Sequence, residues 1–184
     1  MPVDDLWFLA TEARQQAEQV YHRLAEDHED FVEFETARTV SRSRFRTVAQ
    51  RIEDQGLPYG AHTLAYRPSG ELLLVKQAAI DTWVLPGGEV DDGETFREGA
   101  RRELREEAGI DVEYEGLGVL GEVRFRNGDH HTWGVLPVFE GEAVTTEPTV
   151  RDPDDEITDA KWFDELPENT RDRAQLERWR DHRF

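Results

Sequence analysis

Three glutamates at helical spacing are the residues of this chain best suited to chemistry. Glu103, Glu106 and Glu107 are three and four positions apart, so on a helix their carboxylates share one face. Like charges on one face repel by about 0.2–0.5 kcal/mol per pair, and a bound divalent cation would turn this cost into binding. Carboxylate oxygens are hard ligands that favour Mg²⁺, with Mn²⁺ as a substitute. The spacing therefore predicts a metal site able to bind phosphate groups.

A glycine turn precedes these carboxylates and extends the pattern. Gly87 and Gly88 lack a Cβ atom, which lets the backbone approach a phosphate or an ion closely. The segment resembles the Nudix box, whose form is Gly, five residues, Glu, seven residues, Arg-Glu-aliphatic-any-Glu-Glu-any-Gly-aliphatic. Every fixed position is matched, by Gly88, Glu94, Arg102, Glu103, Leu104, Glu106, Glu107, Gly109 and Ile110.

Composition alone does not explain the match. Of 184 residues, 41 are Asp or Glu, so three named positions are all acidic about once in a hundred by chance. The acidic triplet by itself would be compatible with a solvated helix face. The glycine, arginine and aliphatic residues at fixed offsets make a coincidence very improbable.

The resemblance implies a set of metal ligands and catalytic residues. Catalysis and metal binding would fall to Glu103, Glu106 and Glu107, and the carbonyl of Gly87 would be a further metal ligand. The general base stays open, because it would be either Glu103 or a carboxylate outside the box. Candidates outside it are Glu140, Glu142 and the acidic run at 152–156.

Three other box residues would support the site without reacting. The resemblance implies that Arg102 pairs with Glu94 and fixes the loop to the helix, with Gly88 shaping the turn. Arg102 adjoins Glu103 in sequence but is about 100° away around a helix, so we expect its side chain to stay off the metal face.

Substrate selection would depend on residues outside the box. Trp83, Trp133 and His131 are candidates, because an aromatic ring on a strand could stack on a nucleobase. Aromatic residues on strands more often belong to the core, which is the alternative for each of them. A second feature is a group of arginines without any Asp or Glu among them, namely Arg38, Arg42, Arg44, Arg46 and Arg51. These could contact phosphate, RNA or an acidic partner, or form a solvated helix face.

The composition excludes several classes of function. The net charge is −19, and Lys76 and Lys161 are the only lysines. This acidic, lysine-poor surface resembles proteins of salt-loving archaea and argues against general nucleic-acid binding. The absence of cysteine excludes disulfides and thiolate catalysis. The sequence shows neither a signal peptide nor an apolar run long enough to span a bilayer, so we expect a cytoplasmic protein without membrane contact.

Periodicity divides the chain near residue 58. Apolar residues at steps of three and four predict a helix from Asp4 to about Ala25, and a second helix carries Phe45 to Ile52 before Gly56 and Pro58. We therefore expect an N-terminal helical segment over 1–58 and a Nudix domain over 59–184. The amphipathic first helix is a candidate homodimer interface.

The remainder alternates between short strands and two helices. Strands are predicted at 59–66, 71–76, 82–85, 110–125, 132–139 and 157–163, and helices at 94–108 and around Leu176 and Trp179. The Asn127-Gly128 pair indicates a hairpin. This order indicates an α+β protein, and the resemblance implies an α/β/α sandwich with a mixed sheet.

The sequence thus predicts a Mg²⁺-dependent hydrolase of the Nudix type. It would cleave a pyrophosphate bond in a nucleoside diphosphate linked to another moiety and release a nucleoside monophosphate. Two alternatives are a Nudix-fold ligand sensor or regulator and an RNA 5′-end pyrophosphohydrolase. The sensor is disfavoured by the complete set of Glu103, Glu106 and Glu107, and the RNA enzyme by the overall acidity.

Overall fold

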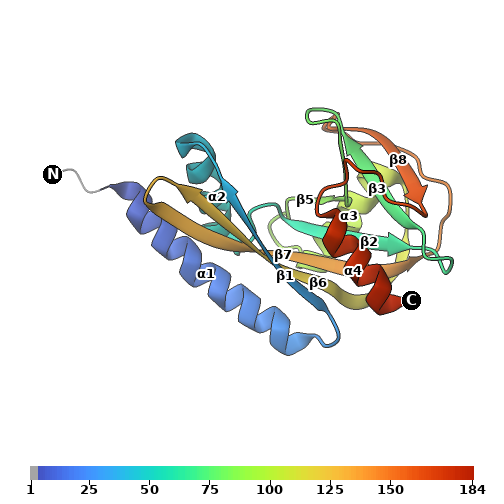
Figure 1. The fold of residues 1–184 in the computed structure, drawn as a ribbon, viewed down its shortest axis with the longest axis horizontal. Helices are drawn as coiled ribbons and strands as arrows, with labels where there is room; N and C mark the ends of the chain where they lie inside the picture. The colour runs from blue at the N-terminus through green and yellow to red at the C-terminus, as the bar shows by residue number, and fades with distance from the viewer. Residues whose placement is uncertain (1–3) are drawn as a thin grey trace. The chain divides into compact units, whose positions relative to one another are not determined.

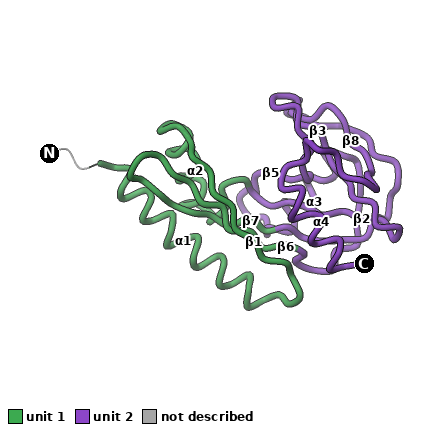
Figure 2. Tube along the Cα trace, viewed as in Figure 1, with its two compact units in different colours: residues 1–59, 119–137 green, residues 60–118, 138–184 purple. Residues whose placement is uncertain are grey.

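The computed structural model describes residues 4–184, which form two compact units (Figure 2). Unit 1 combines residues 1–59 with 119–137, and unit 2 combines residues 60–118 with 138–184. Two long strands, β6 (Val112–Asn127) and β7 (His130–Ala143), contribute residues to both units. The turn between them contains Gly128 at a φ of 57°, which confirms the predicted hairpin.

Two amphipathic helices form the bulk of unit 1 (Figure 1). Helix α1 (Asp5–Asp27) begins after Asp4, whose carboxylate accepts a hydrogen bond from the amide of Leu6. Helix α2 (Arg42–Gln55) ends at Gly56, which adopts a left-handed conformation. The helices pack against each other, and a Cβ on Gly56 would lie only 2.6 Å from Val20. Their buried residues are Leu6, Ala10, Ala13, Ala17, Val20, Leu24, Phe45, Val48, Ala49 and Ile52.

The N-terminal segment is not purely helical, which corrects the expectation from the sequence. Strand β1 (Val32–Thr39) lies between α1 and α2 and pairs in parallel with β6, with Val32 opposite Val119. Its acidic positions alternate with apolar ones, and Val32 is buried while Glu33 is exposed. The partner strand comes from residues far along the chain, so local sequence gave little indication of the pairing.

Unit 2 contains a mixed sheet around the box turn. Its further strands are β2 (Ala61–Tyr66), β3 (Leu72–Gln77), β4 (Thr82–Val84), β5 (Gly87–Gly88) and β8 (Ile157–Phe163). Strand β2 pairs in parallel with β7 and antiparallel with β3 and β5, while β3 pairs antiparallel with β4 and β8. The glycine turn is therefore hydrogen-bonded into the sheet next to β2.

Two helices contact opposite faces of β2. Thr63 donates to the carbonyl of Ala100 in α3 (Phe96–Ala108), whereas Tyr66 packs against Trp179 in α4 (Arg173–Arg183). Successive strand residues face opposite sides, so odd and even positions of β2 meet different helices. This arrangement confirms the predicted α+β sandwich. No helix among residues 4–184 is both long and apolar enough to cross a bilayer.

Candidate active site

Helix α3 is fixed at both ends by its own sequence. Thr95 accepts from the amide of Glu98 and Glu98 accepts from the amide of Thr95, which forms a capping box. Gly109 closes the helix in a left-handed conformation. The buried face packs into the core of unit 2 through Leu104 and Ala108. Glu107 belongs to this buried face, whereas the side chains of Glu103 and Glu106 are partly exposed.

The glycine turn approaches the helix so closely that side chains would not fit. A Cβ on Gly88 would lie 2.8 Å from the carboxylate carbon of Glu103. A Cβ on Gly87 would lie 2.5 Å from the carbonyl oxygen of Ala61 and equally near the ring of His62. The amide of Thr63 also donates to the carbonyl of Pro86 at 3.0 Å. Fixed backbone therefore requires glycine at 87, whereas a side chain at 88 would displace the movable carboxylate end of Glu103.

Glu107 is the most buried of the three carboxylates, with 7% of the residue exposed. Its Oε2 accepts a hydrogen bond of 3.0 Å from the amide of Gly87. Loss of solvation raises the pKa of Glu107 to about 9, against the opposing effect of this bond, and Glu103 and Asp152 raise it further. Burial also raises the pKa of Glu103, although Arg102 opposes that shift. Low solvation of Glu103 and Glu107 therefore favours a proton or a cation beside each carboxylate.

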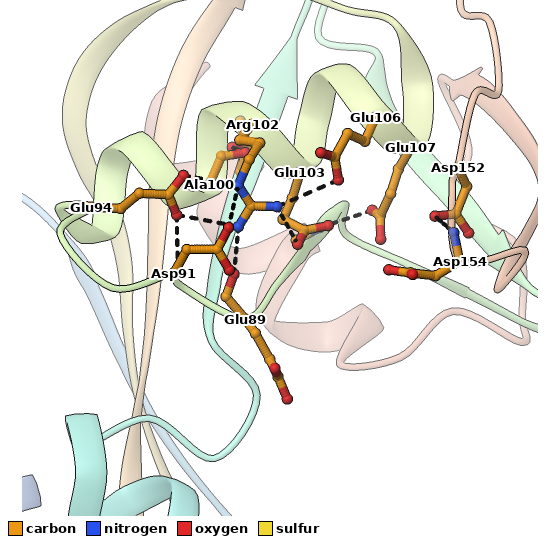
Figure 3. Close-up of polar contacts among 12 residues, drawn as sticks. Glu89, Asp91, Glu94, Ala100, Arg102, Glu103, Glu106, Glu107, Asp152 and Asp154 are labelled. Carbon is orange, nitrogen blue, oxygen red and sulfur yellow. Dashed lines mark hydrogen bonds and ion pairs between the residues drawn. The ribbon is translucent and has the colours of Figure 1, made fainter.

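In this structure the guanidinium of Arg102 pairs with the carboxylates of Glu103 and Glu106 (Figure 3). Its Nε donates to Glu94 Oε1 at 2.8 Å, the ion pair that the resemblance implies. Its Nη1 lies 3.0 Å from Glu103 and 3.4 Å from Glu106, and its Nη2 donates to the carbonyl of Glu89. The expectation that Arg102 stays off the metal face was wrong, because its long side chain bends back across the helix surface.

The acidic run beyond β7 lies next to the same carboxylates. Figure 3 shows Asp152 and Asp154 beside Glu107. Asp152 uses both carboxylate oxygens to accept from backbone amides, including those of Asp154 at 3.2 Å and Glu156 at 2.6 Å. The amide of Arg151 donates to the carbonyl of Glu106, which fixes this run against the end of α3. From the sequence, the run at 152–156 was a candidate for the general base, but its position beside α3 was not predicted.

Glu140, another candidate base, lies in a different environment. Its Oε2 accepts a hydrogen bond of 2.7 Å from the indole of Trp179, which belongs to α4. Burial raises the pKa of Glu140, while this hydrogen bond lowers it. Glu140 is therefore engaged on the α4 side of the sheet, away from the face that Thr63 presents to α3.

The three substrate candidates fall into different units. Trp83 lies in unit 2 and is buried, with Phe163 at 4.8 Å and the ammonium groups of Lys76 and Lys161 at 5.6 and 5.9 Å from its ring. The only two lysines of the chain thus flank one tryptophan.

The other two candidates lie in unit 1 and contact α1. His131 Nδ1 lies 2.9 Å from a guanidinium nitrogen of Arg14, and the ring of Trp133 meets that of Tyr21. Their proposed role in substrate binding stays a prediction.

The donor set fits a hard divalent cation. Glu103 lies against Gly88 and Glu107 is bonded to the amide of Gly87, and both carboxylates are poorly solvated. Among residues 4–184, no three acidic, histidine or cysteine side chains are already arranged around a common ion position. The guanidinium of Arg102 instead bonds Glu103 and Glu106. A cation would compete with this guanidinium for the same oxygens.

Comparison with known proteins identifies the family. The NUDIX domain model matches residues 56–179, so the chain belongs to the Nudix family. A putative 8-oxo-dGTP diphosphatase of Bacillus subtilis is 35% identical over 89 residues, which cover 48% of this chain and 60% of that protein. An 8-oxo-dGDP phosphatase of Danio rerio is 29% identical over 132 residues, covering 65% and 37% of the two chains. The matches thus span less than two thirds of these relatives.

Solved structures show the same fold. A MutT NUDIX hydrolase from Burkholderia pseudomallei is 33% identical, with a TM-score of 0.51 over 64% of this chain and 94% of that one. A NUDIX hydrolase from Nitrosomonas europaea, 22% identical, reaches a TM-score of 0.52 over 68% and 72% of the two chains and supports the fold alone.

Proposed function

We propose that this protein is a divalent-metal-dependent pyrophosphohydrolase of nucleotides. It cleaves a pyrophosphate bond in a nucleoside diphosphate linked to another moiety and releases a nucleoside monophosphate. A nucleoside triphosphate is the simplest such substrate, because its further moiety is a phosphate. Mg²⁺ is the expected cofactor and Mn²⁺ its substitute, since all the candidate donors are oxygens.

The placement of Glu103 and Glu107 against the box turn, with Glu106 bonded to the same Arg102 as Glu103, carries this proposal. Two of these carboxylates are poorly solvated, and the backbone of Gly87 bonds one of them directly. Polyphosphate substrates are anionic, so a site made of carboxylates alone would repel them. A bound divalent cation neutralises the non-bridging oxygens and polarises water for attack on phosphorus.

The chain's own residues position this chemistry. Glu103, Glu106, Glu107 and the carbonyl of Gly87 would hold the cation. The amide of Gly87 orients Glu107, and Arg102 links Glu94 to the metal-binding face. Removal of a proton from the attacking water requires a base within about 2.6–3.2 Å or one water further away. Glu103 and the 152–156 run are the candidates whose charges act on this site, whereas Glu140 is engaged by Trp179.

The relatives favour nucleoside triphosphates or diphosphates among the candidate substrates. Two of them are named for 8-oxo-dGTP and 8-oxo-dGDP. We therefore place oxidised and ordinary nucleoside triphosphates first in a substrate panel, followed by ADP-ribose, nucleotide sugars and dinucleotides. The acidic surface also argues against an RNA 5′-end as the target.

One experiment tests the proposal. The protein is incubated with this panel at high and low salt, with and without Mg²⁺, and compared with Glu106→Gln and the control Glu113→Gln. We expect metal-dependent release of a nucleoside monophosphate, a loss of about 100-fold or more in kcat for Glu106→Gln, and no change for the exposed Glu113. Nucleotide binding without product under every condition would instead identify a ligand sensor.

A further inference from the structure

The two glycines of β5 have their side-chain positions filled from opposite faces. A Cβ atom on Gly87 would lie 2.5 Å from ring atoms of His62, whereas a Cβ atom on Gly88 would lie 2.8 Å from the carboxylate carbon of Glu103. Successive strand residues face opposite sides, so the imidazole and the carboxylate lie on different faces of this short strand. The box turn is therefore held between a ring from β2 and a carboxylate from α3.

Strand β2 also fixes the backbone of the turn. His62 pairs in antiparallel register with Gly87, and the amide of the next residue, Thr63, donates to the carbonyl of Pro86 at 3.0 Å. Thr63 contacts α3 through the carbonyl of Ala100, so the side chain of its neighbour His62 is on the other face of β2. The ring thus supports the turn from the side opposite the carboxylates, and it belongs to a strand outside the box motif.

The ring contacts Gly87 by packing rather than by a hydrogen bond. Its atoms nearest to the Cβ position of Gly87 are Cγ and Cδ2. Its Nδ1 is one of three buried side-chain nitrogen or oxygen atoms without a hydrogen-bond partner among residues 4–184. Removal of a packed group leaves a space into which its neighbours relax. The position of Gly87 therefore depends on the shape of the residue at 62.

Gly87 connects this packing contact to the candidate metal site. Its amide donates to the carboxylate of Glu107 at 3.0 Å, and its carbonyl is an expected ligand of the cation. A turn that relaxes toward β2 would lengthen this hydrogen bond and withdraw the carbonyl from α3. Hydrogen bonds weaken with distance and misalignment, and a displacement of about 1 Å in a site has large effects on its function.

We propose that His62 is a positioning residue of the candidate active site: its ring holds Gly87 against Glu107 and so sets the affinity for the divalent cation. This inference rests on the proposed function, because it assumes that the cation is bound beside Glu103 and Glu107. The ring neither binds the cation nor transfers a proton in this role. Its shape is therefore what matters, and its nitrogens are dispensable.

Two substitutions at position 62 separate shape from chemistry. His62→Ala removes the whole ring, whereas His62→Asn keeps planar atoms where Cγ, Nδ1 and Cδ2 lie and removes the rest. Leu64→Ala is the matched control, because Leu64 is fully buried on the same face of β2 but is in register with Glu140 rather than with the turn. Circular dichroism and thermal unfolding establish the folding and Tm of each variant.

The main measurement is the Kd for Mg²⁺ alone, by calorimetry, with Glu106→Gln defining the ions bound elsewhere on the acidic surface. We expect His62→Ala to raise this Kd about fivefold or more. We expect His62→Asn and Leu64→Ala to stay within about twofold of wild type, although both alanine variants lower Tm. Hydrogen exchange of the Gly87 amide, followed by NMR, should become faster in His62→Ala only.

Three outcomes would overturn the inference. The first is a wild-type Kd for Mg²⁺ in His62→Ala, whatever its Tm. The second is a loss of affinity in Leu64→Ala as large as that in His62→Ala, because any destabilisation of β2 would then weaken the site. The third is a weakened Kd in His62→Asn, which would give the ring nitrogens a role and which decides the question if His62→Ala does not fold.

Calorimetry requires no turnover, so it separates this inference from the proposed function. A protein that binds Mg²⁺ with the expected dependence on position 62 but hydrolyses no nucleotide would refute the proposed function alone. A hydrolase whose Mg²⁺ affinity is indifferent to position 62 would refute this inference alone.

Discussion

The backbone amide of Gly87 donates a hydrogen bond of 3.0 Å to the carboxylate of Glu107, so the turn of the box is bonded directly to its helix. This contact couples the conformation of the turn to the most buried carboxylate of the site. Substitutions in the turn should therefore affect metal binding where they displace a carboxylate of α3, and folding where they displace the backbone of β2.

Alanine at Gly88 and at Gly87 should have different effects. The added methyl at Gly88 meets the mobile end of Glu103, so we expect kcat to fall at least tenfold with little change in Tm. The methyl at Gly87 meets the backbone oxygen of Ala61, so Gly87→Ala should lower Tm clearly. Thermal unfolding and steady-state kinetics distinguish the two, and equal loss of stability in both variants would contradict this account.

Arg102→Lys should destabilise the protein although the charge is retained. Lysine lacks the fork that bonds Glu94, Glu103 and the carbonyl of Glu89 together. We expect a loss of about 1–3 kcal/mol in the free energy of unfolding, measured by urea denaturation. The exposed Arg97, on the same helix, provides the control Arg97→Lys, which should be neutral. A neutral Arg102→Lys would show that the network contributes no net stability.

Glu140→Gln should make stability less dependent on pH. Burial raises the folded-state pKa of Glu140 above its ordinary value of 4.5, so the stability it contributes is complete below that value. This contribution is lost as the pH rises through the folded pKa. Glutamine remains neutral and can still accept from the Trp179 indole. We expect the variant to match wild type near pH 4 and exceed its Tm at pH 7. A Tm difference that is independent of pH would contradict the assigned cause.

Mg²⁺ should raise the Tm even without substrate. A cation that binds only the folded state stabilises it, by about 2.7 kcal/mol when present at 100 times its Kd. Differential scanning fluorimetry with Mg²⁺, against potassium salt of equal ionic strength, measures this shift. Glu106→Gln should reduce the shift and Glu113→Gln should not. An equal shift in Glu106→Gln would place the bound ion elsewhere on this acidic surface.

The sequence predicted the elements whose signals are local. The helix predicted at 94–108 forms from Phe96 to Ala108 and ends at Gly109, and the hairpin follows from Asn127 and Gly128. Strand β1 was missed because its stability depends on pairing with β6, about ninety positions away. The alternation of acidic with apolar residues over Val32–Glu35 is a local strand signal, but the sequence does not show which strand would be its partner.

The site was predictable only where motif spacing fixes it. The box positions gave the carboxylates, but not the reach of Arg102, which depends on the rotamer of a long side chain. Glu140 and the run at 152–156 were equivalent candidates until their neighbours were known.

Strands β6 and β7 each contribute residues to both compact units. This limits where the chain can be shortened without exposing buried side chains. A chain beginning at residue 60 would keep the residues 119–137 and lose the helices packed in the same unit. Side chains of residues 119–137 that are buried in this unit, such as Phe125 and Val135, would then be exposed to water. Removing the N-terminal segment alone would therefore expose this surface, and a shorter version of this protein would need a shortened hairpin as well as a new first residue.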